Sequence, residues 1–80
     1  MILTELPDDG CAVVRGVTPA SPELSPGDLR RLAELGFIPG EPVHLLRRGP
    51  GGREPLAVRV GDTLFALRLA EARCIEVDPA

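Results

Sequence analysis

A chain of 80 residues is too short for two domains, and its formal net charge of -3 argues against a general nucleic-acid binder. Phe37 and Phe65 are the only aromatic residues, so the stacking platforms of many single-strand binders are missing as well. An apolar content of 44% fits one globular domain that spans residues 1–80 rather than a disordered chain.

The N-terminal segment predicts a cytoplasmic protein. Residues 1–6 lack the basic and apolar parts of a secretory signal, and no later apolar run approaches the roughly 20 residues of a membrane span. In the cytosol Cys11 and Cys74 are expected to remain thiols. Any association with a membrane is therefore expected only through a partner.

The first predicted strand covers residues 12–17, a stretch rich in β-branched side chains. It follows the turn cluster Pro-Asp-Asp-Gly at residues 7–10. Prolines and serines then exclude regular structure over residues 18–25. The period of the apolar pattern changes after this break.

Ser25 starts a predicted helix over residues 26–35. Serine is a good helix cap, the proline that follows suits the first helical position, and Asp28 can reach back to the cap. Apolar residues recur along one side at spacings of three and four. Gly36 is placed to end the helix in a left-handed conformation.

The second half of the chain predicts a meander of three strands over residues 43–48, 55–60 and 63–68. The loop at residues 49–52 and the two-residue turn at residues 61–62 would join them.

One helical turn over residues 69–72 and a closing strand over residues 74–77 complete the expected chain. We expect the closing strand to return beside the first one. Five short strands with tight turns and one inserted α-helix predict a mainly β protein, a small SH3-like five-stranded barrel.

Residues 29–43 resemble the FeoA pattern, in which a short helix ends in Leu-Gly and an apolar pair followed by Pro-Gly leads into a strand. The most specific portion is Leu-Gly-Phe-Ile-Pro-Gly at residues 35–40. Later blocks resemble the family in the same order and at similar spacing, at residues 55–61, 65–68 and 72–77. The resemblance covers residues 6–77.

This resemblance implies a small cytoplasmic accessory protein of bacterial ferrous iron uptake. Its implied partner is the cytoplasmic GTP-binding domain of a FeoB-type transporter. The barrel also resembles the C-terminal domain of iron-dependent repressors, which leaves open a stand-alone module that binds or senses a transition metal. A peptide or nucleic-acid reader is a third reading, and the acidic charge disfavours its nucleic-acid form.

No catalytic arrangement is evident in the sequence. It has one histidine, no phosphate loop followed by lysine and a hydroxyl residue, and no nucleophile with an evident base. The Gly-Pro-Gly-Gly stretch at residues 49–52 lies between strands and is better explained as a turn. We predict no enzymatic activity and no required cofactor.

Cys11, Cys74 and His44 are the only soft ligand candidates for a divalent transition metal, and they lack the paired spacing of structural zinc sites. The first and last strands could bring the two thiols together, with Glu76 as an added ligand, if both point away from the core. Two half-buried cysteines and a surface histidine are the commoner outcome for such positions.

Arginine side chains are candidates for a partner-binding face, because guanidinium groups bind anionic groups through paired hydrogen bonds. The candidates are two arginines on the helix, two arginines around the first hairpin and two apolar residues that could lie between them. In that order they are Arg30, Arg31, Arg47, Arg48, Phe37 and Leu46. A solvated surface explains the arginines equally well, and core packing is the commoner role for Phe37. Exposed edge strands also allow a homo-oligomer.

Overall fold

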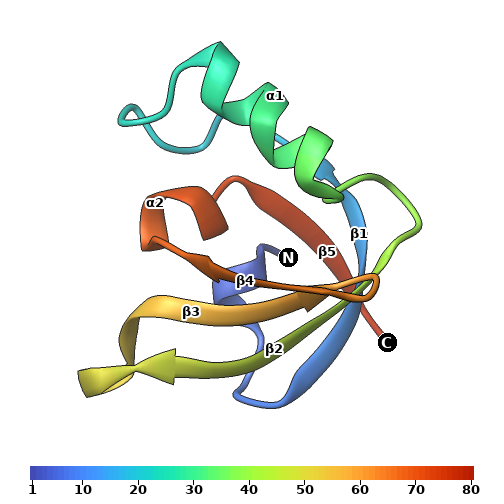
Figure 1. The fold of residues 1–80 in the computed structure, drawn as a ribbon, viewed down its shortest axis with the longest axis vertical. Helices are drawn as coiled ribbons and strands as arrows, with labels where there is room; N and C mark the ends of the chain where they lie inside the picture. The colour runs from blue at the N-terminus through green and yellow to red at the C-terminus, as the bar shows by residue number, and fades with distance from the viewer.

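The fold is a strongly curved sheet with one helix above its open end (Figure 1). The computed structural model describes residues 1–80. In chain order the elements are η1 (Leu3–Glu5), β1 (Gly10–Val17), α1 (Pro26–Leu35), β2 (Pro42–Gly49), η2 (Pro50–Gly52), β3 (Arg53–Val60), β4 (Thr63–Leu67), α2 (Leu69–Ala72) and β5 (Ile75–Pro79).

All neighbouring strands are antiparallel, and their order across the sheet is β4-β3-β2-β1-β5. The last strand therefore lies beside the first, and the predicted mainly β, SH3-like architecture is confirmed. Neither helix has the length and apolar character needed to cross a membrane.

Every strand differs from its predicted range by one or two residues at one or both ends, and the starts of β1 and β5 have clear causes. β1 begins at Gly10, since Gly10 and Cys11 pair with Leu45 and His44 of β2. β5 begins only at Ile75, because the N–H of the preceding residue donates to Glu71 and belongs to the end of α2.

Register shifts at three places bend the sheet, and the last of them lies at the end of β2, between Arg48 and Gly49. The register of β1 with β5 shifts between Val14 and Gly16, and that of β2 with β3 shifts between Leu45 and Arg47. A bulge adds one residue to one strand and increases its local twist, which lets a short sheet fold over itself. The second shift also reverses which face the following residues occupy. Arg47 is exposed as a result, whereas the guanidinium of Arg48 is largely buried.

A single apolar core fills the space inside the curved sheet. Every strand and the N-terminal segment contribute to it through Leu3, Leu6, Ala12, Val14, Leu32, Phe37, Val43, Leu45, Leu56, Val58, Val60, Leu67, Ala72, Cys74, Ile75 and Val77. Phe37 has no exposed surface, and its ring packs against Phe65 with 5.8 Å between centroids. The hypothesis that Phe37 offers an exposed centre for a partner is therefore wrong, because the residue is needed to hold the end of α1 on the barrel.

Both ends of α1 follow the predicted capping pattern. The N–H of Asp28 donates to Ser25 Oγ at 3.1 Å, and the N–H of Ser25 donates to Asp28 Oδ2 at 2.9 Å. Gly36 has a φ of 126°, and the next N–H, that of Phe37, donates to the carbonyl of Leu32. The helix is thus fixed at both ends by its own sequence.

Protonating Asp28 should loosen the start of α1. The Ser25 N–H that donates to its carboxylate, and then the Ser25 hydroxyl, hold the pKa of Asp28 below its ordinary value of 3.8. A lowered pKa in the folded state means that the stabilisation is present above the unfolded-state pKa and is lost as the pH falls through the folded one. Asp28→Asn should lower the Tm at neutral pH, and the difference from wild type should shrink at a pH below 3.8. A Tm difference that stays constant down to acid pH would contradict this role.

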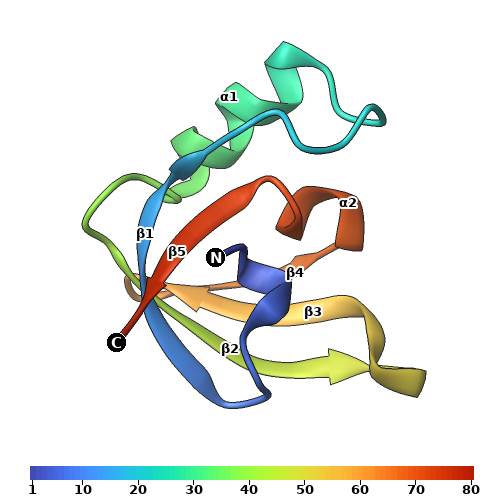
Figure 2. The same cartoon turned by 180° about the vertical axis from the view of Figure 1, so that it is seen from behind.

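The two edges of the sheet differ in how they are covered. Val77 of β5 donates its N–H to the carbonyl of Met1 at 2.8 Å, and Ile2 bridges to Glu76, so the N-terminal residues run along the outer edge of β5. Figure 2 shows the N-terminal segment beside this strand. No segment of the chain pairs with the outer edge of β4, which is the first strand in the sheet order.

Candidate functional site

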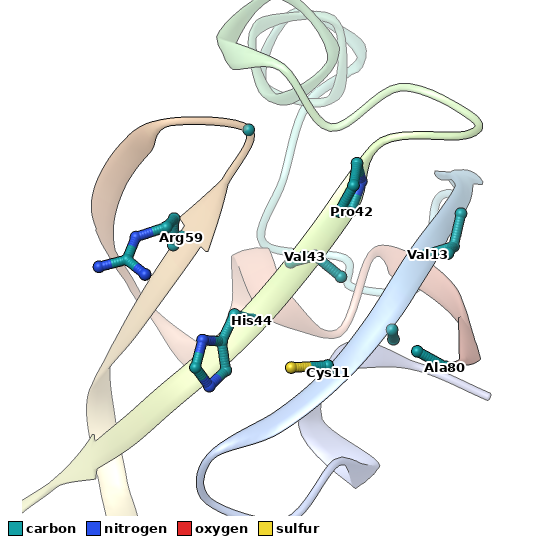
Figure 3. A pocket seen from close by; sticks show the side chains of 9 residues that line it. Cys11, Val13, Pro42, Val43, His44, Arg59 and Ala80 are labelled. Atoms are coloured by element: carbon teal, nitrogen blue, oxygen red, sulfur yellow. The ribbon is translucent and has the colours of Figure 1, made fainter.

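The outer face of the sheet carries the residues that were candidates for metal binding. Cys11 of β1 lies directly opposite His44 of β2, and His44 lies opposite Arg59 of β3, so the three form one row across the strands. Figure 3 shows the Cys11 sulfur directed toward His44. The Cys11 side chain is exposed, and a shallow cavity of about 220 Å³ lies along this row.

His44 is held by a carboxylate from the turn before β1. Its Nε2 lies 2.6 Å from Asp9 Oδ1, and the imidazole is 27% exposed. The register of β1 against β2 brings the two together, because the chain turns into β1 directly after Asp9. A carboxylate in this position fixes the orientation of the ring.

Cys74 lies far from this row. It is fully buried behind α2, where its Sγ donates to the Ala70 carbonyl at 3.5 Å. Its chain neighbour Ile75 pairs with Val17, six residues along β1 from Cys11. At about 3.3 Å per residue that separation is about 20 Å. The alternative in which the two thiols meet on one metal is therefore wrong, because the turn between α2 and β5 directs Cys74 into the core; the commoner outcome, two half-buried cysteines, is not seen either, since Cys11 is exposed and Cys74 is buried.

Glu76 was a possible added ligand, and it too lies away from Cys11, since it pairs with Gly16. Nowhere in residues 1–80 do three or more His, Cys, Asp or Glu side chains come together in a group that could hold a metal ion. The structure brings together only two of the predicted soft ligands, Cys11 and His44.

Arg48 is occupied within the domain. Its Nη2 donates to the carbonyl oxygens of Thr4 at 2.6 Å and Leu6 at 2.7 Å, and its Nη1 donates to Asp8 Oδ1 at 2.6 Å. Its side chain is 18% exposed. The residue ties the N-terminal segment to β2, so its guanidinium is not available to a partner as the sequence suggested.

The other predicted arginines lie at opposite ends of the molecule. Arg47 is exposed beside the hairpin that joins β2 and β3, and its neighbour Leu46 is half-buried at the bulge. Arg30 and Arg31 are exposed on α1. Figure 1 shows α1 and the β2–β3 hairpin at the two ends of the fold. The arginines therefore do not form one continuous basic face.

A groove between α1 and β4 was not predicted. It has a volume of about 260 Å³ and a mostly polar exposed surface, and the apolar residues that line it are Leu32, Leu35, Phe65, Ala66 and Leu67. Its rim carries two acids and two arginines, Asp28, Glu71, Arg31 and Arg68. Of the predicted partner-binding residues, only Arg31 lines it.

The two acids on the rim already have partners. Asp28 accepts from the Ser25 N–H, and Glu71 accepts from the Arg68 N–H at 2.8 Å. Arg31 makes no ion pair within the domain. No local pattern in the sequence indicates this groove, because its two sides, α1 and β4, are separated along the chain by β2 and β3.

Comparison with known families gives a match over nearly the whole chain. The model of the FeoA domain matches residues 1–79. A comparison with curated protein sequences gave no significant match.

Several solved structures share the fold. FeoA from Stenotrophomonas maltophilia, solved in complex with zinc, is 47% identical over 98% of this chain and 89% of its own, with a TM-score of 0.83. It is described as a prokaryotic SH3 domain protein and as a candidate activating factor of ferrous iron transport. FeoA from Chlorobium tepidum is 33% identical over 99% of this chain and 70% of its own, with a TM-score of 0.82. Iron(II) transport protein A from Clostridium thermocellum is 29% identical over the whole of this chain and 46% of its own, with a TM-score of 0.81.

Proposed function

This chain belongs to the FeoA family, which is associated with ferrous iron transport, and from that premise we propose that it is a cytoplasmic accessory protein that binds a FeoB-type transporter. The proposed contact is with the cytoplasmic GTP-binding domain of the transporter. The chain would act by binding alone, without catalysis and without a required cofactor.

The observation that carries this proposal is the groove between α1 and β4. Leu35 is 36% exposed and Phe65 is only partly buried, so some apolar surface remains open within a concave site whose exposed surface is mostly polar. Such a site suits an apolar anchor side chain of a partner, because binding energy concentrates in desolvated pockets. Arg31 at the rim is free to pair with an acidic group beside that anchor.

A binding protein can regulate a transporter only through unequal affinity for its states. A partner that docks more tightly on one nucleotide state of the GTP-binding domain shifts the population toward that state. Because α1 is capped at both ends and held through Leu32 and Phe37, the groove presents a preformed surface and loses little entropy on binding.

A binding titration tests the proposal. The purified chain, labelled after Ala80 so that the N-terminal pairing with β5 stays intact, is titrated with the detergent-solubilised transporter of the same cell. Guanine nucleotide and ferrous ion are each present or absent. We expect saturable binding that Arg31→Glu and Leu35→Glu weaken about tenfold or more, as for residues near the centre of an interface.

Arg47→Glu is the matched control, because it makes the same change of charge at the far end of the fold. It should leave the Kd within about twofold. Absence of binding in every nucleotide and metal state would rule out the accessory role. Equal weakening by Arg31→Glu and Arg47→Glu would instead show that the groove is not the docking site.

Transition-metal binding is a second candidate function, favoured by one observation. Cys11 and His44 are direct cross-strand neighbours on an accessible face, and the relative from S. maltophilia was solved with zinc. Two soft donors are half of the tetrahedral set that zinc usually takes. The pair does not complete a site on its own, so water or another molecule would have to supply the remaining ligands.

Thermal unfolding with and without added Zn²⁺ tests this second function. A ligand that binds only the folded state stabilises it by an amount that grows with the logarithm of its concentration over its Kd, and so raises the Tm. We expect Zn²⁺ to raise the Tm of the wild type but not that of Cys11→Ser or His44→Gln. A Tm that does not respond to Zn²⁺ in the wild type would remove the metal function and leave the docking proposal intact.

A further inference from the structure

We infer that the open edge of β4 pairs with β4 of a second copy of this chain, antiparallel and centred on Phe65, so that one sheet runs through both copies. This self-pairing goes beyond the proposed function and does not depend on it, but it uses the strand that lines one side of the docking groove, so a second copy and the transporter would compete for this strand.

β4 lacks the features that normally protect a sheet edge. Natural edge strands are shielded by charges, prolines, bulges or covering segments. The strand reads Thr-Leu-Phe-Ala-Leu over Thr63–Leu67, with no charge and no proline, and its register with β3 is regular from Val60 to Leu56. The opposite edge of the sheet is covered by Met1 and Ile2.

The hairpin geometry identifies which backbone groups face outward. Gly61 and Asp62 form a two-residue connection, so the flanking residues Val60 and Thr63 form a hydrogen-bonded pair. Alternation along the ladder then directs the N–H and C=O groups of Leu64 and Ala66 away from β3. Both residues are exposed, and neither backbone takes part in a hydrogen bond outside the regular elements.

Pairing centred on Phe65 satisfies these groups. Leu64 of one copy then lies opposite Ala66 of the other, and each donates to and accepts from its partner, as in a hydrogen-bonded antiparallel pair. The same contact covers the side chain of Leu64, which is 59% exposed in the single chain.

Charge selects the same register. When Phe65 lies opposite Phe65, the turn residue Asp62, one position before β4, comes level with Arg68, one position after β4, of the second copy, and the two-fold symmetry repeats this approach at the other end. Asp62 is exposed and makes no ion pair within the domain, and Arg68 makes only a long contact of 3.7 Å with Glu71. A shift of the register by two residues would place Asp62 opposite Ala66 or Ala70 and lose both pairs.

Sedimentation equilibrium over a range of protein concentrations tests this inference. EDTA and a reducing agent in the buffer exclude metal-linked and disulfide-linked association. We expect the mass to rise from one chain toward two. Asp62→Arg should raise the dissociation constant about tenfold, because it places two repulsive pairs in the interface. Asp62→Arg combined with Arg68→Asp should restore it.

Two controls keep the result specific. Glu23→Arg makes the same change of charge on an exposed loop and should leave the dissociation constant unchanged. Leu64→Lys should abolish dimerisation, because a lysine places a positive charge on the edge of β4. The variant should keep the Tm of the wild type, since residue 64 is exposed and does not belong to the core. A wild type that stays a single chain at every concentration would overturn the inference, and so would a dimer that neither Asp62→Arg nor Leu64→Lys weakens.

Discussion

Replacing Phe37 with alanine should lower the free energy of unfolding by about 3 to 5 kcal/mol, the cost of truncating a fully buried aromatic side chain. The ring has no exposed surface, contacts Phe65, and directly follows the end of α1. Its removal leaves a cavity at the junction of helix and barrel, and it also removes the apolar anchor that holds α1 in place. Urea unfolding followed by circular dichroism measures the change.

Ile38→Ala is the matched control, because Ile38 is the next residue and is 44% exposed. Ile38→Ala should lower the free energy of unfolding by no more than about 1 kcal/mol. A small domain has only about 5 kcal/mol or somewhat more to lose, so Phe37→Leu provides a milder truncation that should remain folded. Equal losses for Phe37→Ala and Ile38→Ala would show that Phe37 is not part of the core.

Replacing Arg48 with methionine should lower the free energy of unfolding by about 2 to 4 kcal/mol. Methionine keeps much of the apolar stem but removes the donors to the carbonyls of Thr4 and Leu6 and the partner of Asp8. The two carbonyls then lose their hydrogen bonds in a partly buried place. The N-terminal segment, which contributes Leu3 and Leu6 to the core, should detach more easily.

Arg47→Met is the control, since Arg47 is the exposed neighbour on the same strand and has no ion pair. Arg47→Met should change the free energy of unfolding by no more than about 0.5 kcal/mol. Hydrogen exchange adds a local measure, because the amide of Val77 donates to Met1 and should lose protection in Arg48→Met. Unchanged protection there would show that Arg48 does not hold the N-terminal segment.

Local signals were sufficient to predict most of the fold. The helix from Pro26 to Leu35 was predicted because Ser25, Asp28 and Gly36 act within a few residues of where they stand. The order of the strands followed from tight turns and from the short length of the chain, which leaves few ways to bury apolar faces.

The candidate site was harder to predict because its properties depend on contacts between distant segments. The role of Arg48 depends on the bulge at Leu45, which reverses the facing of later residues without any proline or glycine to mark it. Cys74 was expected to alternate with Ile75 in a strand, but it lies in the turn that follows α2 and its side chain is buried. The groove exists only because α1 lies near β4, which no local pattern specifies.

The pairing of the first residues with the last strand also determines how the domain responds to a pulling force. Met1 bonds to Val77, near the opposite end of the chain, and Ile2 bridges to Glu76 in antiparallel fashion. A force applied between the two ends therefore separates these bonds one after another, as in unzipping, instead of loading them together in shear. Because Leu3 and Leu6 follow directly and belong to the core, a molecular machine that pulls on either end would reach the core at its first step.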